Sequence, residues 1–318
     1  MRIAIDEAVA DVPDAHRWLD RIIEKVEDEW HLWEVTGFEK YGDSSWVRDQ
    51  GRRGQHVIEL FRAAVTRSAY PSVHERLIRV TLHPARNTEL EPKPAAYLAE
   101  EPMTILVENR DSDGTFLRRV IREVAPSELS ALFSRPGKPI RFDSCGGGGQ
   151  MPEEIQRRCQ DAAVRPRLVA IADSDRVAPG LSANAQARRL ENVCSQYGVP
   201  CWILAKRENE NYLTYSLLAA RPDSGQDHHR RLECWERLSD DRKDFYDMKR
   251  GFRGRQSAAA QGLFDGLSSA DVAELRDGFG DGVGQCWDVL WSTRIKNELL
   301  ERGGEDLQRG CVLIQREV

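Results

Sequence analysis

Three carboxylates follow two runs of apolar, β-prone residues in the sequence. Glu108 comes directly after the run 104–107, and Asp173 and Asp175 come after the run 167–172. If these runs are neighbouring strands of a parallel sheet, the three side chains converge at its carboxyl edge, where such sheets bind ligands. Mg²⁺ and Mn²⁺ prefer carboxylate oxygens as ligands. One or two such ions would activate water and stabilise the leaving oxygen in the cleavage of a phosphodiester.

The acids also have a purely structural interpretation, because acids after a strand often serve as solvated loop residues or helix N-caps. Two other features of the sequence likewise have both a functional and a structural interpretation. The four glycines 146–149 would form a phosphate-binding nest or a tight connection between a strand and a helix. A run of cations without an acid would contact nucleic-acid phosphates or lie in a solvated loop. Its members are Lys249, Arg250, Arg253 and Arg255.

The elements that must position these residues alternate between strands and helices from about residue 103 to 220. We predict strands at 104–107, 139–142, 167–172 and 200–204, and helices at 116–124, 153–162 and 185–197. Such alternation is typical of βαβ units around a parallel sheet. The predicted fold class is therefore α/β, with a Rossmann-like, mainly parallel sheet at the centre.

The flanking segments have different patterns. Helical spacing over 14–26 and 57–65 and a strand over 76–82 indicate an N-terminal α/β region. The prolines of segment 89–102 disfavour helix there, so we place a domain boundary in it. After residue 222 the spacing is helical, apart from one short strand over 312–314. The predicted organisation is an N-terminal region 1–100, a catalytic domain 101–222 and a mostly helical region 223–318.

Composition limits the classes of function. The 318 residues carry 46 Lys and Arg against 52 Asp and Glu, a net charge of -6, so a nucleic-acid site must be a local patch or depend on bound metal. Mean hydropathy is -0.57. The sequence has no apolar run long enough for a membrane span and no signal-peptide pattern, which predicts a cytoplasmic protein without a membrane partner. Seven cysteines without metal-binding spacing predict free thiols.

Two motifs together resemble a known domain. The segments ILVE (105–108) and VAIADSD (169–175) resemble the TOPRIM domain, the metal-binding fold of topoisomerases, primases and certain nucleases. The segment LAKRENENYL (204–213) resembles the one that follows the last TOPRIM strand in OLD-family nucleases and their relatives in bacterial anti-phage defence. The resemblance implies that Glu108, Asp173 and Asp175 bind Mg²⁺ or Mn²⁺, and that Asp111 or Asp113 completes the first metal site.

The same resemblance implies further residues and partners. Glu210 would be the acid of a second metal site, and Lys249 would be the catalytic lysine that OLD-type nucleases carry downstream. The sequence lacks the GxxxxGK[ST] motif, so ATP-driven control would come from a separate ATPase subunit. We expect the N-terminal region and the helices of 258–301 to dock that partner or a second copy of the chain, and we expect DNA rather than RNA as substrate.

Three functions are compatible with these motifs. The first is a metal-dependent endonuclease that serves as the effector subunit of an anti-phage defence complex. The alternative is an assembly or sensor subunit whose TOPRIM fold binds nucleic acid or a partner without cutting. Retention of the three core acids disfavours this alternative, because converging carboxylates are costly without a cation. The third is a topoisomerase or primase subunit. The sequence disfavours it, because it contains no recognisable cleavage-tyrosine domain or zinc ribbon.

Overall fold

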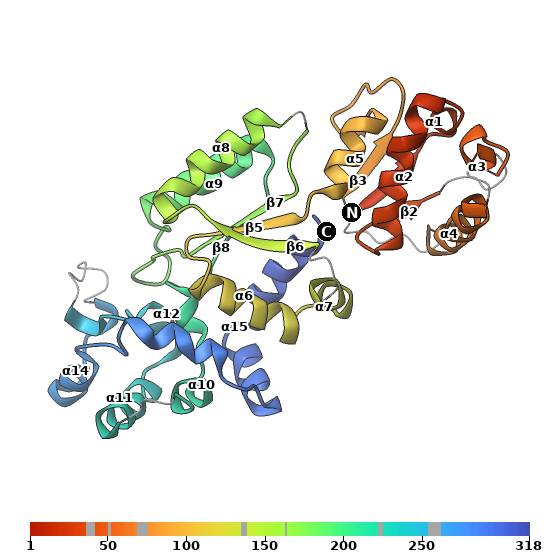
Figure 1. Cartoon of the computed structure of the whole chain (residues 1–318). Coiled ribbons are helices and arrows are strands. Elements are labelled where there is room, and N and C mark those ends of the chain that lie inside the picture. The colour runs from red at the N-terminus through yellow and green to blue at the C-terminus, as the bar shows by residue number, and fades with distance from the viewer. Residues whose placement is uncertain are drawn as a thin grey trace.

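The computed structural model describes residues 1–35, 42–49, 52–68, 76–134, 139–162, 164–221, 225–253 and 262–318. It contains two four-stranded sheets in which every neighbouring pair of strands is parallel (Figure 1). The first sheet has the order β2-β1-β3-β4 and the second β6-β5-β7-β8. The strands are β1 Arg2–Ile5, β2 Leu32–Glu34, β3 Leu77–Val80, β4 Glu89–Leu90, β5 Met103–Val107, β6 Ile140–Ser144, β7 Leu168–Ala172 and β8 Cys201–Ile203. The predicted α/β class with a parallel sheet is confirmed.

Both sheets have the same strand order, although the sequence shows no repeat. In each, the chain adds its second strand on one side of the first strand and its third strand on the other side. The second sheet therefore has its topological switch point between β5 and β7. Every residue of these two strands is buried, as expected for central strands covered on both faces. The carboxyl ends of β5 and β7 flank the crevice where open parallel sheets bind ligands.

Helices cover both faces of the second sheet (Figure 1). Helices α8 (Met151–Asp161) and α9 (Ala185–Tyr197) lie together on one face, and α6 (Ser112–Glu123) lies on the other with α7 (Ser127–Ser134) beside it. Alternate residues of β5 serve the two faces, since Ile105 packs in the cluster with Phe116 while Leu106 packs with Met151. The sheet is thus fixed from both sides, which fixes the ends of its strands.

The N-terminal region has its own core around the first sheet. Its helices are α1 (Glu7–Ala10), α2 (Pro13–Glu27), α3 (Ser45–Asp49), α4 (Arg52–Ser68) and α5 (Pro92–Glu100). The expectation that the prolines of 89–102 disfavour helix is wrong for most of this segment, because α5 occupies Pro92–Glu100. Pro92 stands in the first turn, where the missing N–H has no intrahelical partner to lose. Ala95, Ala96 and Leu98 are buried, so the segment is packed core.

The C-terminal region is mostly helical, as predicted. It contains α10 (Tyr215–Ala219), α11 (Gln226–Glu236), α12 (Asp240–Phe245), α14 (Ser269–Leu275) and α15 (Thr293–Gln315), and short 3-10 helices add η1 (Gly148–Gln150), η2 (Asn209–Tyr212), η3 (Gly251–Arg253) and η4 (Asp281–Asp288). The predicted strand at 312–314 is wrong. These residues end α15, whose buried Leu307, Cys311 and Ile314 recur at helical spacing, and a short apolar run does not distinguish the two structures.

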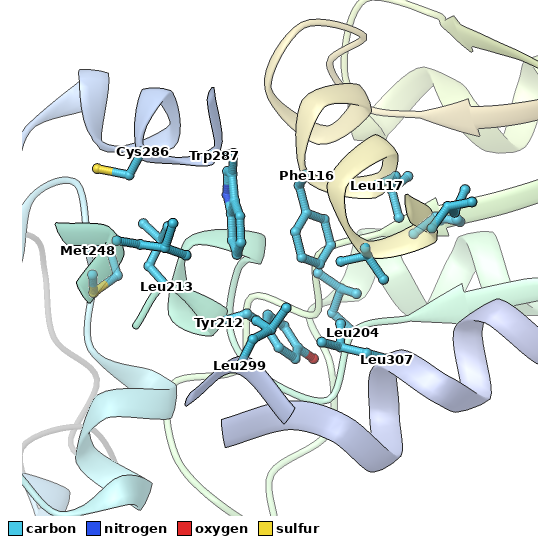
Figure 2. Packing of buried hydrophobic residues seen from close by; sticks show 14 of the residues in the cluster. Phe116, Leu117, Leu204, Tyr212, Leu213, Met248, Cys286, Trp287, Leu299 and Leu307 are labelled. Carbon is cyan, nitrogen blue, oxygen red and sulfur yellow. The ribbon is translucent and has the colours of Figure 1, made fainter. Parts of the chain in front are cut away.

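One hydrophobic core joins the second sheet to the C-terminal helices. Figure 2 shows Trp287 of η4 beside Phe116 of α6, with Tyr212 of η2 and Leu299 of α15 below them. The Phe116 and Trp287 rings lie 4.9 Å apart between centroids. This cluster extends from residue 103 to residue 318 and so crosses the predicted boundary at 222. All seven cysteines are free, and within the described ranges no helix is long and apolar enough to span a bilayer.

Candidate metal centre

Glu108 and Asp173 lie at the switch point of the second sheet. Glu108 directly follows β5 and Asp173 directly follows β7. The two strands are hydrogen-bonded neighbours with Leu106 opposite Ala170, so both acids emerge at the same edge. The Glu108 carboxylate has no hydrogen-bond or ion-pair partner within the described residues, which leaves both of its oxygens available as ligands.

The segment 208–213 returns to this edge and contacts both acids and the helical region. Asn209 is 2% exposed and donates twice: its backbone N lies 2.9 Å from Asp173 Oδ1, and its Nδ2 lies 2.9 Å from Asp113 Oδ1. Its own Oδ1 accepts the Trp287 indole N–H at 3.2 Å. Asn209 thus joins β7, α6 and η4 at one point. Sequence reasoning missed it, and its only signal was its place inside the ENENYL motif.

Two glutamates of the same segment hold Lys249 between them. The Lys249 Nζ lies 3.2 Å from Glu208 Oε2 and 3.0 Å from Glu210 Oε1. Glu210 is 1% exposed, and its second oxygen, Oε2, has no hydrogen-bond partner among the described residues. Glu208 also closes a capping box with Asn211, which fixes η2. The sequence analysis named Glu210 and Lys249 but missed Glu208, two residues earlier in the motif.

The structure distinguishes between the two candidates on α6. Asp111 is exposed at the N-cap of the helix. Asp113 points to the cluster, where its Oδ1 accepts from Ser112 Oγ at 3.2 Å and its Oδ2 accepts from the backbone N of Asn109 at 2.9 Å. Asp113 is therefore the acid that belongs to the cluster, and its hydrogen bonds fix its orientation.

Asp175 stands at the outer side of the centre on a strained turn. Its φ of 49° is left-handed, and its backbone N donates to Arg207 O at 2.9 Å. The buried Ser174 Oγ donates to Lys206 O at 2.6 Å. These two bonds tie the loop after β7 to the loop after β8. The side chain of Asn184 holds the Asp175 carboxylate in place.

The electrostatics of the centre are those of carboxylates that lie close together and are partly withdrawn from water. Burial raises the pKa of Glu108 to about 7, and the charges of Asp113 and Asp175 add to the shift. Burial, followed by the charges of Asp113 and Glu210, raises the pKa of Asp173 well above its usual range. Burial also raises the pKa of Glu210, against the effect of Lys249. Such carboxylates favour a bound cation, which removes their mutual repulsion.

The donor set fits a hard divalent cation. Its donors are carboxylate oxygens, two of which belong to the unpartnered Glu108 and one of which is the buried, unpartnered Oε2 of Glu210. Among the residues that the structure describes, no group of three or more Asp, Glu, His or Cys side chains lies close enough together to hold a metal ion. Carboxylates without a cation between them repel one another, so a bound ion would have to draw these acids together.

The predicted run of cations does not form one patch. Lys249 pairs with the two glutamates, and Arg253 pairs with Asp277. Arg250 is exposed and remains available for a phosphate. Arg255 lies outside the described residues.

The glycine loop lies near the centre. Gly146 and Gly147 have φ values of 83° and 136°, which residues other than glycine rarely adopt. A Cβ on Gly149 would lie 3.5 Å from the Gln186 side chain, in the first turn of α9. The N-cap of α9 is Asn184, which binds Asp175. Both interpretations of the loop, the phosphate nest and the tight connection, are compatible with this position.

Comparison with known proteins adds no relative. No family model matches the chain, and no curated protein and no solved structure is similar to it. The interpretation of the centre therefore depends on its motifs, its topology and its side-chain geometry.

Proposed function

We propose that the chain is a metal-dependent nuclease that hydrolyses phosphodiester bonds at the carboxyl edge of the second sheet. One observation supports this most: Glu108, Asp113, Asp173 and Glu210 come from separate elements and converge at the switch point. Glu210 is buried and the other three are partly buried, and among the described residues Lys249 is the cation that pairs with Glu210. A set of acids that is partly withdrawn from water and has so little compensating charge favours a bound divalent ion.

Each residue of the centre has a distinct role in this proposal. Glu108, Asp173, Asp175 and Glu210 hold Mg²⁺ or Mn²⁺, which when bound supplies positive charge for the phosphate and lowers the pKa of water. Asn209 fixes the relative positions of Asp113 and Asp173 through its two hydrogen bonds. The Lys249 ammonium stabilises negative charge that develops on the phosphate oxygens. Arg250 contacts the substrate backbone.

The resemblance in the motifs extends the proposal to a fold family and partners. We propose that residues 101–222 form a TOPRIM domain of the OLD type. Its substrate would be DNA, and a separate ATPase subunit would control it in a cytoplasmic anti-phage complex. Supporting observations are the strand order of the second sheet, the acids after β5 and β7, and the return of the ENENYL segment to those acids.

One observation favours the second candidate, a subunit that binds nucleic acid without cutting. The ammonium of Lys249 already lies within hydrogen-bond distance of a Glu210 oxygen, so part of the acid cluster has a counter-ion without metal. A centre neutralised in this way would keep its shape and bind nucleic acid through Arg250 and its neighbours alone. Metal-dependent cleavage separates the two candidates.

The experiment is a cleavage assay with the purified full chain. Supercoiled plasmid, linear DNA and total RNA are incubated with Mn²⁺, Mg²⁺ or EDTA, with and without an ATPase encoded beside the gene. Asp173→Asn and Glu108→Gln remove ligand charge, and Asp241→Asn is a matched control at an exposed position of α12. We expect cleavage that requires metal, persists in Asp241→Asn and disappears in the other two variants. Absence of cleavage under every condition would contradict the nuclease proposal.

A further inference from the structure

The ammonium of Lys249 is a fixed part of the acid cluster. Its Nζ lies about equally far from one oxygen of Glu208 and one of Glu210, at 3.2 and 3.0 Å. Glu210 lies in η2 and Glu208 is its N-cap, whose capping box holds the helix in shape. The two ion pairs restrain the lysine side chain, and the position of its backbone decides whether the side chain can reach both carboxylates.

The backbone of Lys249 is tied to the segment before η4. Phe279 N donates to Met248 O at 2.7 Å, and Gly280 N donates to Lys249 O at 3.0 Å. The two segments approach so closely at Gly251 that a Cβ there would lie 2.2 Å from Leu275 O, and its φ of 58° is left-handed. These contacts hold the backbone of the lysine turn against residues 275–280.

Asp247 connects the lysine turn to Arg207 through a hydrogen bond and an ion pair. Asp247 Oδ1 accepts the backbone N of Arg250 at 2.7 Å, and Asp247 Oδ2 accepts from Arg207 Nη2 at 2.9 Å. Arg207 also approaches Glu208, with its Nε 3.3 Å from Oε1. Arg207 thus connects the glutamate segment directly to the lysine turn. The lysine turn and the glutamate segment are therefore held together both by the ion pairs of Lys249 and by the contacts of Arg207.

A second divalent ion at Glu208 and Glu210 would meet this ammonium at contact distance. The ion would need the same two oxygens that Lys249 holds, and at such a short distance the ammonium and a divalent cation would repel each other. The remaining free oxygens are those of Glu108 and the Oε2 of Glu210, together with the part of Asp173 that Asn209 does not use. These oxygens provide enough donors for one hard divalent ion, whose remaining ligands would be water.

We propose that Lys249 takes the place of a second metal ion, so that this centre binds a single divalent cation. The inference depends on the proposed function, and it replaces the two-ion interpretation in which Glu210 serves a second site. The lysine supplies one fixed positive charge where paired-metal sites have an ion at about 3.5–4 Å from the first. The class of ligand is a hard divalent ion such as Mn²⁺.

The test counts Mn²⁺ ions bound to the intact chain by titration with electron paramagnetic resonance. We expect one tightly bound ion in the wild type and in Lys249→Arg, which keeps the charge. Lys249→Met and the more polar Lys249→Gln remove the charge and should bind two ions, whose coupled spectrum reveals a pair. Lys93→Met, at an exposed position of α5, is the matched control and should bind one. Circular dichroism establishes that each variant is folded.

The outcomes separate this inference from the proposed function. A wild type that binds two ions overturns the inference, as does a folded Lys249→Met or Lys249→Gln variant that still binds one. Neither result affects the nuclease proposal. A wild type that binds no Mn²⁺ would overturn the metal-dependent function itself and the inference with it. Because the wild-type count alone can contradict the inference, the test does not depend on the stability of the variants.

Discussion

Replacing Asn209 by alanine should destabilise the protein far more than an ordinary polar substitution. The change removes the hydrogen bond from Asn209 Nδ2 to the Asp113 carboxylate and leaves the buried Trp287 indole N–H without its acceptor. A hydrogen bond to a charged group contributes about 1.5–3 kcal/mol, and an unpartnered buried donor costs about 1–3 kcal/mol. Together we expect the free energy of unfolding to fall by about 3 to 5 kcal/mol.

Chemical denaturation monitored by tryptophan fluorescence and circular dichroism measures this loss. Asn192→Ala is the control, because Asn192 is exposed on α9, and it should change the free energy by less than about 0.5 kcal/mol. In a Trp287→Phe background the donor is already absent, so Asn209→Ala should cost about 1 to 2 kcal/mol less. A loss below about 1 kcal/mol in the wild-type background, or no difference between backgrounds, would refute the role assigned to Asn209.

Other predictions concern packing and pH. A Cβ on Gly310 would lie 2.3 Å from the Trp202 ring, so Gly310→Ala should lower the free energy of unfolding by about 1–3 kcal/mol. A Cβ on Gly304, in the same helix, would lie 3.6 Å from Leu300, so Gly304→Ala should not lower it. Equal effects of the two variants in denaturant melts would contradict this prediction. His31 is buried, and burial and the charge of Arg167 lower its pKa well below the usual range. Its unfolded form takes up a proton first, so the stability that neutral His31 contributes is lost as the pH falls below about 6.5, by up to about 1.4 kcal/mol per pH unit. His31→Gln should lose less stability than the wild type between about pH 7.5 and about pH 5.5, and parallel losses would count against this assignment.

The parts of the centre that the sequence predicted are those set by local pattern. Glu108 and Asp173 follow buried strands, and the consecutive apolar residues of β5 and β7 predict that these strands are buried. The order of the strands, which makes β5 and β7 neighbours, follows from packing over long range and has no sequence signal. Asp113 was one of two candidates, and only the hydrogen bonds around it separate it from Asp111.

The residues that sequence reasoning missed depend on contacts between distant segments. Asn209 acts through Trp287, which lies on a 3-10 helix without a usable periodicity. The run of cations has no acid beside it in the sequence, but Asp277, which is distant in sequence, pairs with Arg253 in the folded chain. The helix over 92–100 was not predicted because proline disfavours the interior of a helix, although it is common in the first turn.

Iron-mediated cleavage of the protein backbone tests the central claim most directly. Fe²⁺ bound in place of Mg²⁺, in the presence of ascorbate and peroxide, generates radicals that cut the chain next to the ion. We predict cuts in three separate segments, near residues 108–113, 173–175 and 208–210, that Mn²⁺ suppresses and Asp173→Asn abolishes. Cuts elsewhere, or the same cuts in Asp173→Asn, would contradict a metal centre at the carboxyl edge of the second sheet.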